Sequence, residues 1–165
     1  MELRHRIWNL MGPERRLRAA QAFWAEKNPA HAQAEAMLAG RLHARPVFVR
    51  RLPPEKKAAY VANDPAINAA VWDAVMVAYH LAAQRALLTD FLNAVGIPNE
   101  NGRLANTDSA TPPTTEQLNQ AIRAVGEKHD KLDVLVYLAA VALQDDRLWQ
   151  NLPPLIVELE KAVRH

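Results

Sequence analysis

Prolines stand at the beginnings of helical patterns throughout this 165-residue chain. Proline suits the first turn of a helix, because the amide hydrogen that it lacks would have no partner there. Asn28 and Asp64 precede two of these prolines and are good helix caps. Glycine is scarce, with five in the chain, and no segment alternates apolar and polar residues over the length of a strand. This pattern predicts an all-α protein, with helices beginning near five prolines: Pro13, Pro29, Pro54, Pro65 and Pro154.

Helical spacing and stop signals together predict seven or eight helices. Thr114 and Gln117 match a capping box at the start of one helix, and Gly96 followed by Pro98 predicts the end of another. The segment RPVFVRR, residues 45–51, is expected to be an extended linker or a further short helix. The expected ranges are 3–10, 13–26, 29–44, 54–62, 65–95, 115–127, 131–147 and 154–163.

Two of the expected helices have apolar residues around most of their circumference. In residues 65–95 apolar or small side chains recur at steps of three and four, and residues 134–143 are apolar throughout. A helix that is apolar all round is surrounded by other helices. We therefore expect an irregular or orthogonal helical bundle, in which outer helices pack around a long central helix at about 65–95.

The length of the chain is typical of a single domain, and we expect residues 1–165 to form one. Residues 97–113 are the only long polar segment. Their Asn101–Gly102 pair predicts a turn followed by an irregular connection. This polar link is expected to separate a larger N-terminal part from a C-terminal helical hairpin and a final helix.

Charge is unevenly distributed along the chain. Residues 1–57 contain twelve Lys or Arg and five acidic residues, a net charge of +7, whereas residues 58–165 contain eight and thirteen, a net charge of −5. The basic part could contact nucleic acid or another acidic partner. Alternatively, the two parts attract each other, within one chain or head to tail between copies.

Composition indicates the compartment. The chain has no cysteine, which excludes disulfides and thiolate metal sites and fits a reducing compartment. The N-terminal residues are too charged for a signal peptide, and the longest apolar run, residues 134–143, is about half of what a bilayer span needs. We expect a soluble cytoplasmic protein that has no contact with membranes.

Three polar residues interrupt the apolar sequence of the long expected helix. Asp73, His80 and Gln84 fall within about 40° of each other on one helix face. One interpretation is a ligand-binding or catalytic pocket, in which His80 is the acid–base group or a ligand and the carboxylate of Asp73 orients the His80 ring. The second is a seam of a buried helix that faces water, and the third is a core histidine bonded to a carbonyl of a neighbouring helix.

A basic cluster lies between residues 41 and 57. It predicts a patch that could bind phosphates, although the interleaved aromatic residues of single-strand-binding proteins are lacking. The alternative is a solvated face that pairs with acidic residues elsewhere in the chain. The members are Arg41, Arg45, Arg50, Arg51, Lys56 and Lys57, with Phe48 beside them.

Motifs for enzymatic chemistry are missing from the sequence. It contains no Glu-x-x-His, no His-Glu-x-x-His and no glycine-rich phosphate loop, so we expect no metal, no cofactor and no catalytic residues. The leading hypothesis is a non-enzymatic interaction module or self-associating subunit, with a protein partner or a second copy favoured over nucleic acid. The alternatives are a small-ligand or enzymatic pocket around His80 and nucleic-acid association through the basic N-terminal part.

Overall fold

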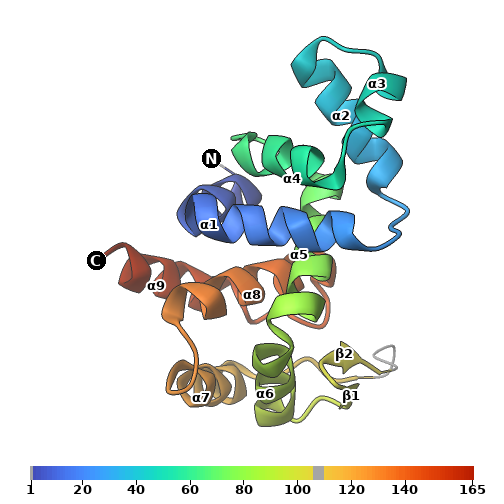
Figure 1. Cartoon of the computed structure of the whole chain (residues 1–165). Coiled ribbons are helices and arrows are strands. Elements are labelled where there is room, and N and C mark those ends of the chain that lie inside the picture. Colours follow the sequence, from blue (N-terminus) through green and yellow to red (C-terminus); the bar gives the residue numbers. More distant parts are fainter. Residues whose placement is uncertain (1, 106–109) are drawn as a thin grey trace. The chain divides into compact units, whose positions relative to one another are not determined.

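A computed structural model describes residues 2–105 and 110–165 and confirms the all-α class (Figure 1). The described part contains nine helices and one two-stranded hairpin. The helices are α1 (Leu3–Ala25), α2 (His31–Leu42), α3 (Pro46–Arg50), α4 (Pro54–Asn63), α5 (Ala69–Ala83), α6 (Arg85–Val95), α7 (Thr115–Gly126), α8 (Lys131–Gln144) and α9 (Pro153–Arg164), and the strands are β1 (Asn99–Glu100) and β2 (Arg103–Leu104).

The chain divides into two compact units, Met1–Ala82 and Ala83–His165. The boundary falls before Ala83, the last residue of α5, and so precedes the polar link predicted at 97–113. The expectation that the whole chain is one domain divided at that link stays a prediction. Residues 106–109 of the link lie outside the described part of the chain.

Helix α1 opens the first unit and contains a kink. Gly12 has φ 75° and ψ 168°, a backbone conformation that only glycine adopts readily, and Pro13 begins the second part of the helix. The two helices predicted on either side of residues 11–12 meet here. The kink frees carbonyls of the first part, and Arg16 binds two of them: its Nε lies 2.7 Å from the oxygen of Trp8, and its Nη2 lies 3.2 Å from the oxygen of Asn9.

Within the first unit, α1 packs along α4, and α2 packs against the short α3 (Figure 1). The core of α1 includes Ile7, Trp8 and Phe23, which are almost fully buried. The indole nitrogen of Trp8 donates to the backbone oxygen of Asp64 at 2.8 Å, which joins α1 to the end of α4. These contacts position the segment between α2 and α4, where the candidate site lies.

The helix expected over 65–95 is interrupted. Residue Asp64 caps a turn rather than a helix, since its Oδ1 accepts from the amide of Ala66 at 2.9 Å. Helix α5 begins at Ala69, after Asn68 accepts from the amide of Val71. The helix then breaks at Gln84, with φ −126° and ψ 27°, and α6 begins at Arg85. The long helix of the prediction is therefore two helices, one in each unit.

The second unit contains the hairpin and four helices. Helix α6 packs against α7 and against β1, and α8 packs against α7 and α9 (Figure 1). The predicted turn is confirmed: Asn101 and Gly102 have φ 51° and 86° and join β1 to β2. The predicted capping box is confirmed too, because Thr114 and Gln117 exchange both of its hydrogen bonds. Every residue from 134 to 140 is buried.

No helix in the described ranges has the length and apolar character needed to cross a bilayer.

Candidate functional site

The three residues of the predicted polar face are divided between the two units. Asp73 and His80 lie on α5 in the first unit, and Gln84 lies at the break that opens the second unit. His80 is buried, and its Nδ1 lies 2.8 Å from the backbone oxygen of Met76, one turn earlier in the same helix. The third interpretation expected a carbonyl of a neighbouring helix, whereas this carbonyl belongs to α5 itself. A ligand-binding role for Asp73, His80 and Gln84 stays a prediction.

Asp73 is engaged by α1. The guanidinium of Arg4 binds its carboxylate through both oxygens, with Nε 2.9 Å from Oδ1 and Nη2 3.1 Å from Oδ2. The hydrogen bond to Asp73 raises the pKa of Arg4 above its ordinary value. A bidentate ion pair of this kind holds both partners in a fixed geometry. It therefore joins the N-terminal end of α1 to α5.

The predicted basic patch separates into two groups. Arg41 and Lys57 are held by carboxylates of the fold: Arg41 Nε lies 3.1 Å from Asp64 Oδ2, and Lys57 Nζ lies 3.2 Å from Glu35 Oε2. Lys57 is also 4.6 Å from the ring centroid of Trp24, a cation–π contact. The ion pair of Arg41 therefore joins α2 to the C-terminal end of α4. The ion pair of Lys57 joins the first turns of α4 to α2.

The other four cations are exposed, and within the described ranges none of them has a carboxylate partner. Three of them, Arg45, Arg50 and Arg51, flank in the sequence the two most exposed hydrophobic side chains of this region, Val47 at 46% and Phe48 at 55%. The fourth, Lys56, lies in the first turn of α4. We call these six residues the α3 surface: Arg45, Val47, Phe48, Arg50, Arg51 and Lys56.

Helical geometry explains the arrangement of the α3 surface. The helix has one buried side chain, Val49, so the residues before it are turned outward. Arg45 and Arg51 lie three positions before and after Phe48, which places all three on one side of the turn. An apolar centre with a cationic border results. Pro46 begins this helix. The helix is only 5 residues long, which is too short to form a second apolar face.

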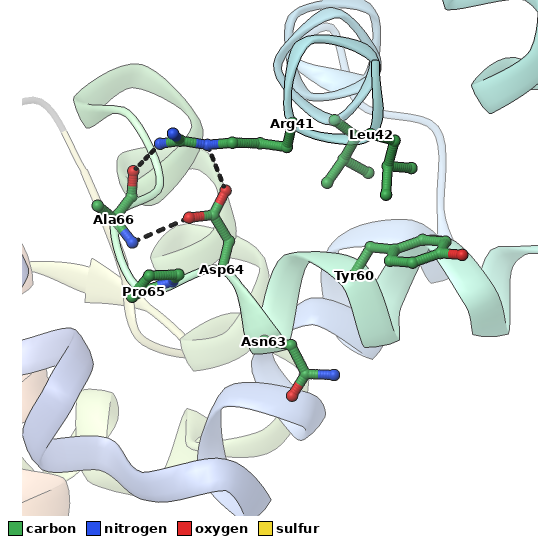
Figure 2. Close-up of a pocket in the computed structure, with 8 residues that line it drawn as sticks. Arg41, Leu42, Tyr60, Asn63, Asp64, Pro65 and Ala66 are labelled. Atoms are coloured by element: carbon green, nitrogen blue, oxygen red, sulfur yellow. Dashed lines mark hydrogen bonds and ion pairs between the residues drawn. The ribbon is translucent and has the colours of Figure 1, made fainter. Parts of the chain in front are cut away.

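A pocket opens beside this region, between the end of α2 and α4 (Figure 2). Its volume is about 300 Å³. Leu42 of α2 faces the ring of Tyr60 on α4, and the stem of Arg41 extends across to Asp64 at the other end. We call it the α2–α4 pocket, and its lining residues are Leu38, Arg41, Leu42, Tyr60, Asn63, Asp64, Pro65 and Ala66.

The charged groups of the α2–α4 pocket already have partners. Asp64 uses one oxygen for Arg41 Nε and the other for the amide of Ala66 (Figure 2). Arg41 also donates from Nη2 to the carbonyl of Ala66 at 3.0 Å. The amide of Asn63 points away from α2 in Figure 2. The surface left for a ligand is therefore the stem of Arg41, two leucines and an aromatic ring.

A further polar arrangement lies near a hollow in the second unit. His129 Nε2 lies 2.8 Å from Asp90 Oδ2, and a hollow of about 420 Å³ lies beside them between α6 and α7. His129 does not line that hollow. No group of three or more potential metal-ligating side chains occurs in the described residues.

Sequence analysis identified the cations of the α3 surface but not its apolar centre. Val47 and Phe48 have the hydrophobicity of core residues, and a sequence does not show that Val49 alone of the three is buried. Tyr60 was missed for a similar reason, since its exposure depends on how α2 ends opposite α4. A search of protein-family models, of curated proteins and of solved structures finds no match to the chain.

Proposed function

We propose that this chain is a non-enzymatic interaction protein that binds an acidic segment of a partner protein through the α3 surface. The single observation that supports the proposal is the exposed pair Val47 and Phe48, close in the chain to four exposed cations that have no carboxylate partner among the described residues. Protein interfaces have this organisation, with an apolar centre, a polar border and arginine as a favoured contact residue. A partner that supplies carboxylates around an apolar side chain would match both parts.

Burial of the apolar centre provides the affinity in this proposal. A phenylalanine that is 55% exposed presents on the order of 100 Å² of apolar surface, worth about 2–3 kcal/mol when covered. The cations provide orientation and a faster encounter with an acidic partner. The proposal therefore assigns different effects to the two kinds of residue: Phe48 governs dissociation, and the arginines govern association and its dependence on salt.

Nucleic acid is the less favoured partner. Phosphate backbones offer no apolar surface that would cover Val47, and the surface has one aromatic ring where single-strand-binding proteins stack successive bases on several. Nucleic-acid binding would also depend mainly on the number of cations and very little on Phe48. A second copy of the chain is a possible protein partner, because residues 83–165 carry eight cationic and eleven acidic residues. The cytoplasm stays the predicted location.

The experiment is a selection of short random peptides displayed on phage against the immobilised full chain, followed by fluorescence anisotropy of individual peptides. We expect enriched peptides to combine Asp or Glu with Leu, Phe or Trp. Phe48→Ala should weaken their binding roughly 30-fold, the equivalent of about 2 kcal/mol. Arg51→Glu should slow their association and reduce the effect of salt.

The matched control is Val157→Ala on α9. Val157 is as exposed as Val47, at 46%, but the charged residue beside it in the sequence is the acidic Glu158. This control should bind the peptides as the unmodified chain does. Single-stranded RNA and duplex DNA are tested in parallel. The proposal fails if these bind more tightly than any selected peptide, or if Phe48→Ala and Val157→Ala bind the peptides equally well.

A further inference from the structure

We propose that the α2–α4 pocket is a second anchor site for the same partner and that it receives one apolar side chain, a leucine, methionine or aromatic residue. The inference rests on the proposed function and adds a specificity determinant to it: the partner carries two apolar anchors with carboxylates beside them. Its first anchor covers Phe48, and its second enters between Leu42 and Tyr60.

The chemistry of the lining requires an apolar occupant. Both carboxylate oxygens of Asp64 accept hydrogen bonds, and Arg41 donates to Asp64 and to the carbonyl of Ala66 (Figure 2). A polar ligand that binds Asp64 or Arg41 would have to compete with these bonds, which is costly. An apolar side chain gains contact with Leu38, Leu42 and the ring of Tyr60 and breaks nothing.

The size of the pocket fits one large side chain. A volume of about 300 Å³ lies at the lower end of the range for small-molecule sites. Tyr60 is 40% exposed although its ring is one wall of the pocket, so apolar surface remains to be covered. An inserted side chain would cover that ring and the outer face of Leu42 together.

Charge complementarity connects this pocket to the α3 surface. Lys56, a member of the α3 surface, lies four residues before Tyr60 and therefore on the same face of α4. At the other end of the pocket, the Arg41 side chain is 56% exposed. An acidic segment that leaves the α3 surface along α4 would meet Lys56 first, then Tyr60 and the pocket, and finally Arg41.

The test of the pocket itself uses small probes. N-acetyl-leucinamide and N-acetyl-tryptophanamide are titrated into the full chain, with N-acetyl-glutaminamide as a polar probe of similar size, and the methyl resonances of Leu38 and Leu42 are followed by NMR. We expect saturable shifts with the two apolar probes, with roughly millimolar dissociation constants, and none with the glutamine probe.

Two variants locate the binding. Tyr60→Ala removes one wall and should abolish the shifts, whereas Tyr60→Phe keeps the ring and should retain them. Because Tyr60 is partly exposed, its truncation is expected to leave the fold intact, and the amide spectrum verifies this. Absence of saturable shifts, or equal shifts with the glutamine probe, would overturn the inference.

The selected acidic peptides separate this inference from the proposed function. We expect Tyr60→Ala to weaken their binding at least fivefold and Tyr60→Phe to leave it unchanged. If Phe48→Ala weakens binding while Tyr60→Ala does not, the second anchor is wrong and the α3 surface stands. If neither variant weakens binding, the proposed function is wrong, and the probe titration alone decides what the pocket accepts.

Discussion

The basic cluster divides into cations that bind carboxylates of the fold and exposed cations of the α3 surface. Lys57 offers the sharpest test of this division. Its ammonium lies 3.2 Å from Glu35 Oε2, 3.4 Å from the carbonyl of Arg50 and 4.6 Å from the Trp24 ring. Lys56, the preceding residue, is exposed. Replacing each lysine in turn by methionine removes the charge and keeps most of the side-chain volume. We expect Lys57→Met to destabilise the chain and Lys56→Met to leave its stability nearly unchanged.

The size of the effect follows from the surroundings of Lys57. Removing one partner of a fully buried ion pair costs about 3–5 kcal/mol. Both side chains here are 11% exposed, so water still reaches the carboxylate of Glu35 that is left behind. The cation–π contact with Trp24 adds about 0.5–1 kcal/mol. We therefore expect a loss of about 2–4 kcal/mol for Lys57→Met, against less than about 0.5 kcal/mol for Lys56→Met.

Urea denaturation of the full-length variants, followed by tryptophan fluorescence and circular dichroism, measures both values. Glu35→Gln combined with Lys57→Met removes the stranded carboxylate, and this double variant should be more stable than the sum of the two single losses predicts. Equal, small losses for Lys56→Met and Lys57→Met would show that the contacts of Lys57 with Glu35 and Trp24 do not stabilise the fold. Both lysines would then be surface charges, and the α3 surface would have to be redefined.

Four further substitutions test the fold. Gly12→Ala should lower the free energy of unfolding by about 1–3 kcal/mol, because Gly12 has φ 75°, whereas Gly40→Ala inside α2 should raise it by about 0.5–1 kcal/mol. Urea denaturation measures both values. A loss of stability at Gly40 equal to that at Gly12 would contradict the explanation from the backbone conformation. Burial raises the pKa of Tyr137 above the 10.0 of a free tyrosine, so the stabilisation from this group is complete below pH 10 and is lost as the pH rises further. Tyr137→Phe should remove that component of the alkaline decline, a slope of up to about 1.4 kcal/mol per pH unit, and identical profiles for the two proteins would contradict it. Asp64→Asn should destabilise by up to about 1 kcal/mol through loss of the ion pair with Arg41, and an unchanged urea midpoint would show that this pair contributes nothing.

Local signals predicted much of the fold. The capping box at Thr114, the left-handed Gly96 that ends α6 and the Asn101–Gly102 turn all depend on the preferences of one or two residues, and each is confirmed. The break at Gln84 was not predicted because neither proline nor glycine marks it. Periodicity of apolar residues continues through the break, so the sequence pattern is that of a single helix.

The candidate site was predictable only in part. The six cations of the cluster can be counted from the sequence, but which of them bind carboxylates of the fold depends on contacts between residues far apart in the chain. Lys57 meets Glu35 across 22 positions, and Arg41 meets Asp64 across 23. No local pattern distinguishes Lys57 from Lys56, although one is buried and the other is exposed.

The most direct test of the central claim is a map of where a selected acidic peptide binds. Backbone amide shifts of the full chain are measured by NMR as the peptide is added. We expect the largest shifts on residues 45–51 and on Lys56, and we expect these shifts to disappear in Phe48→Ala. Shifts centred on Val157, on the α6–α7 hollow or on the surroundings of His80, with residues 45–51 unchanged, would contradict this prediction.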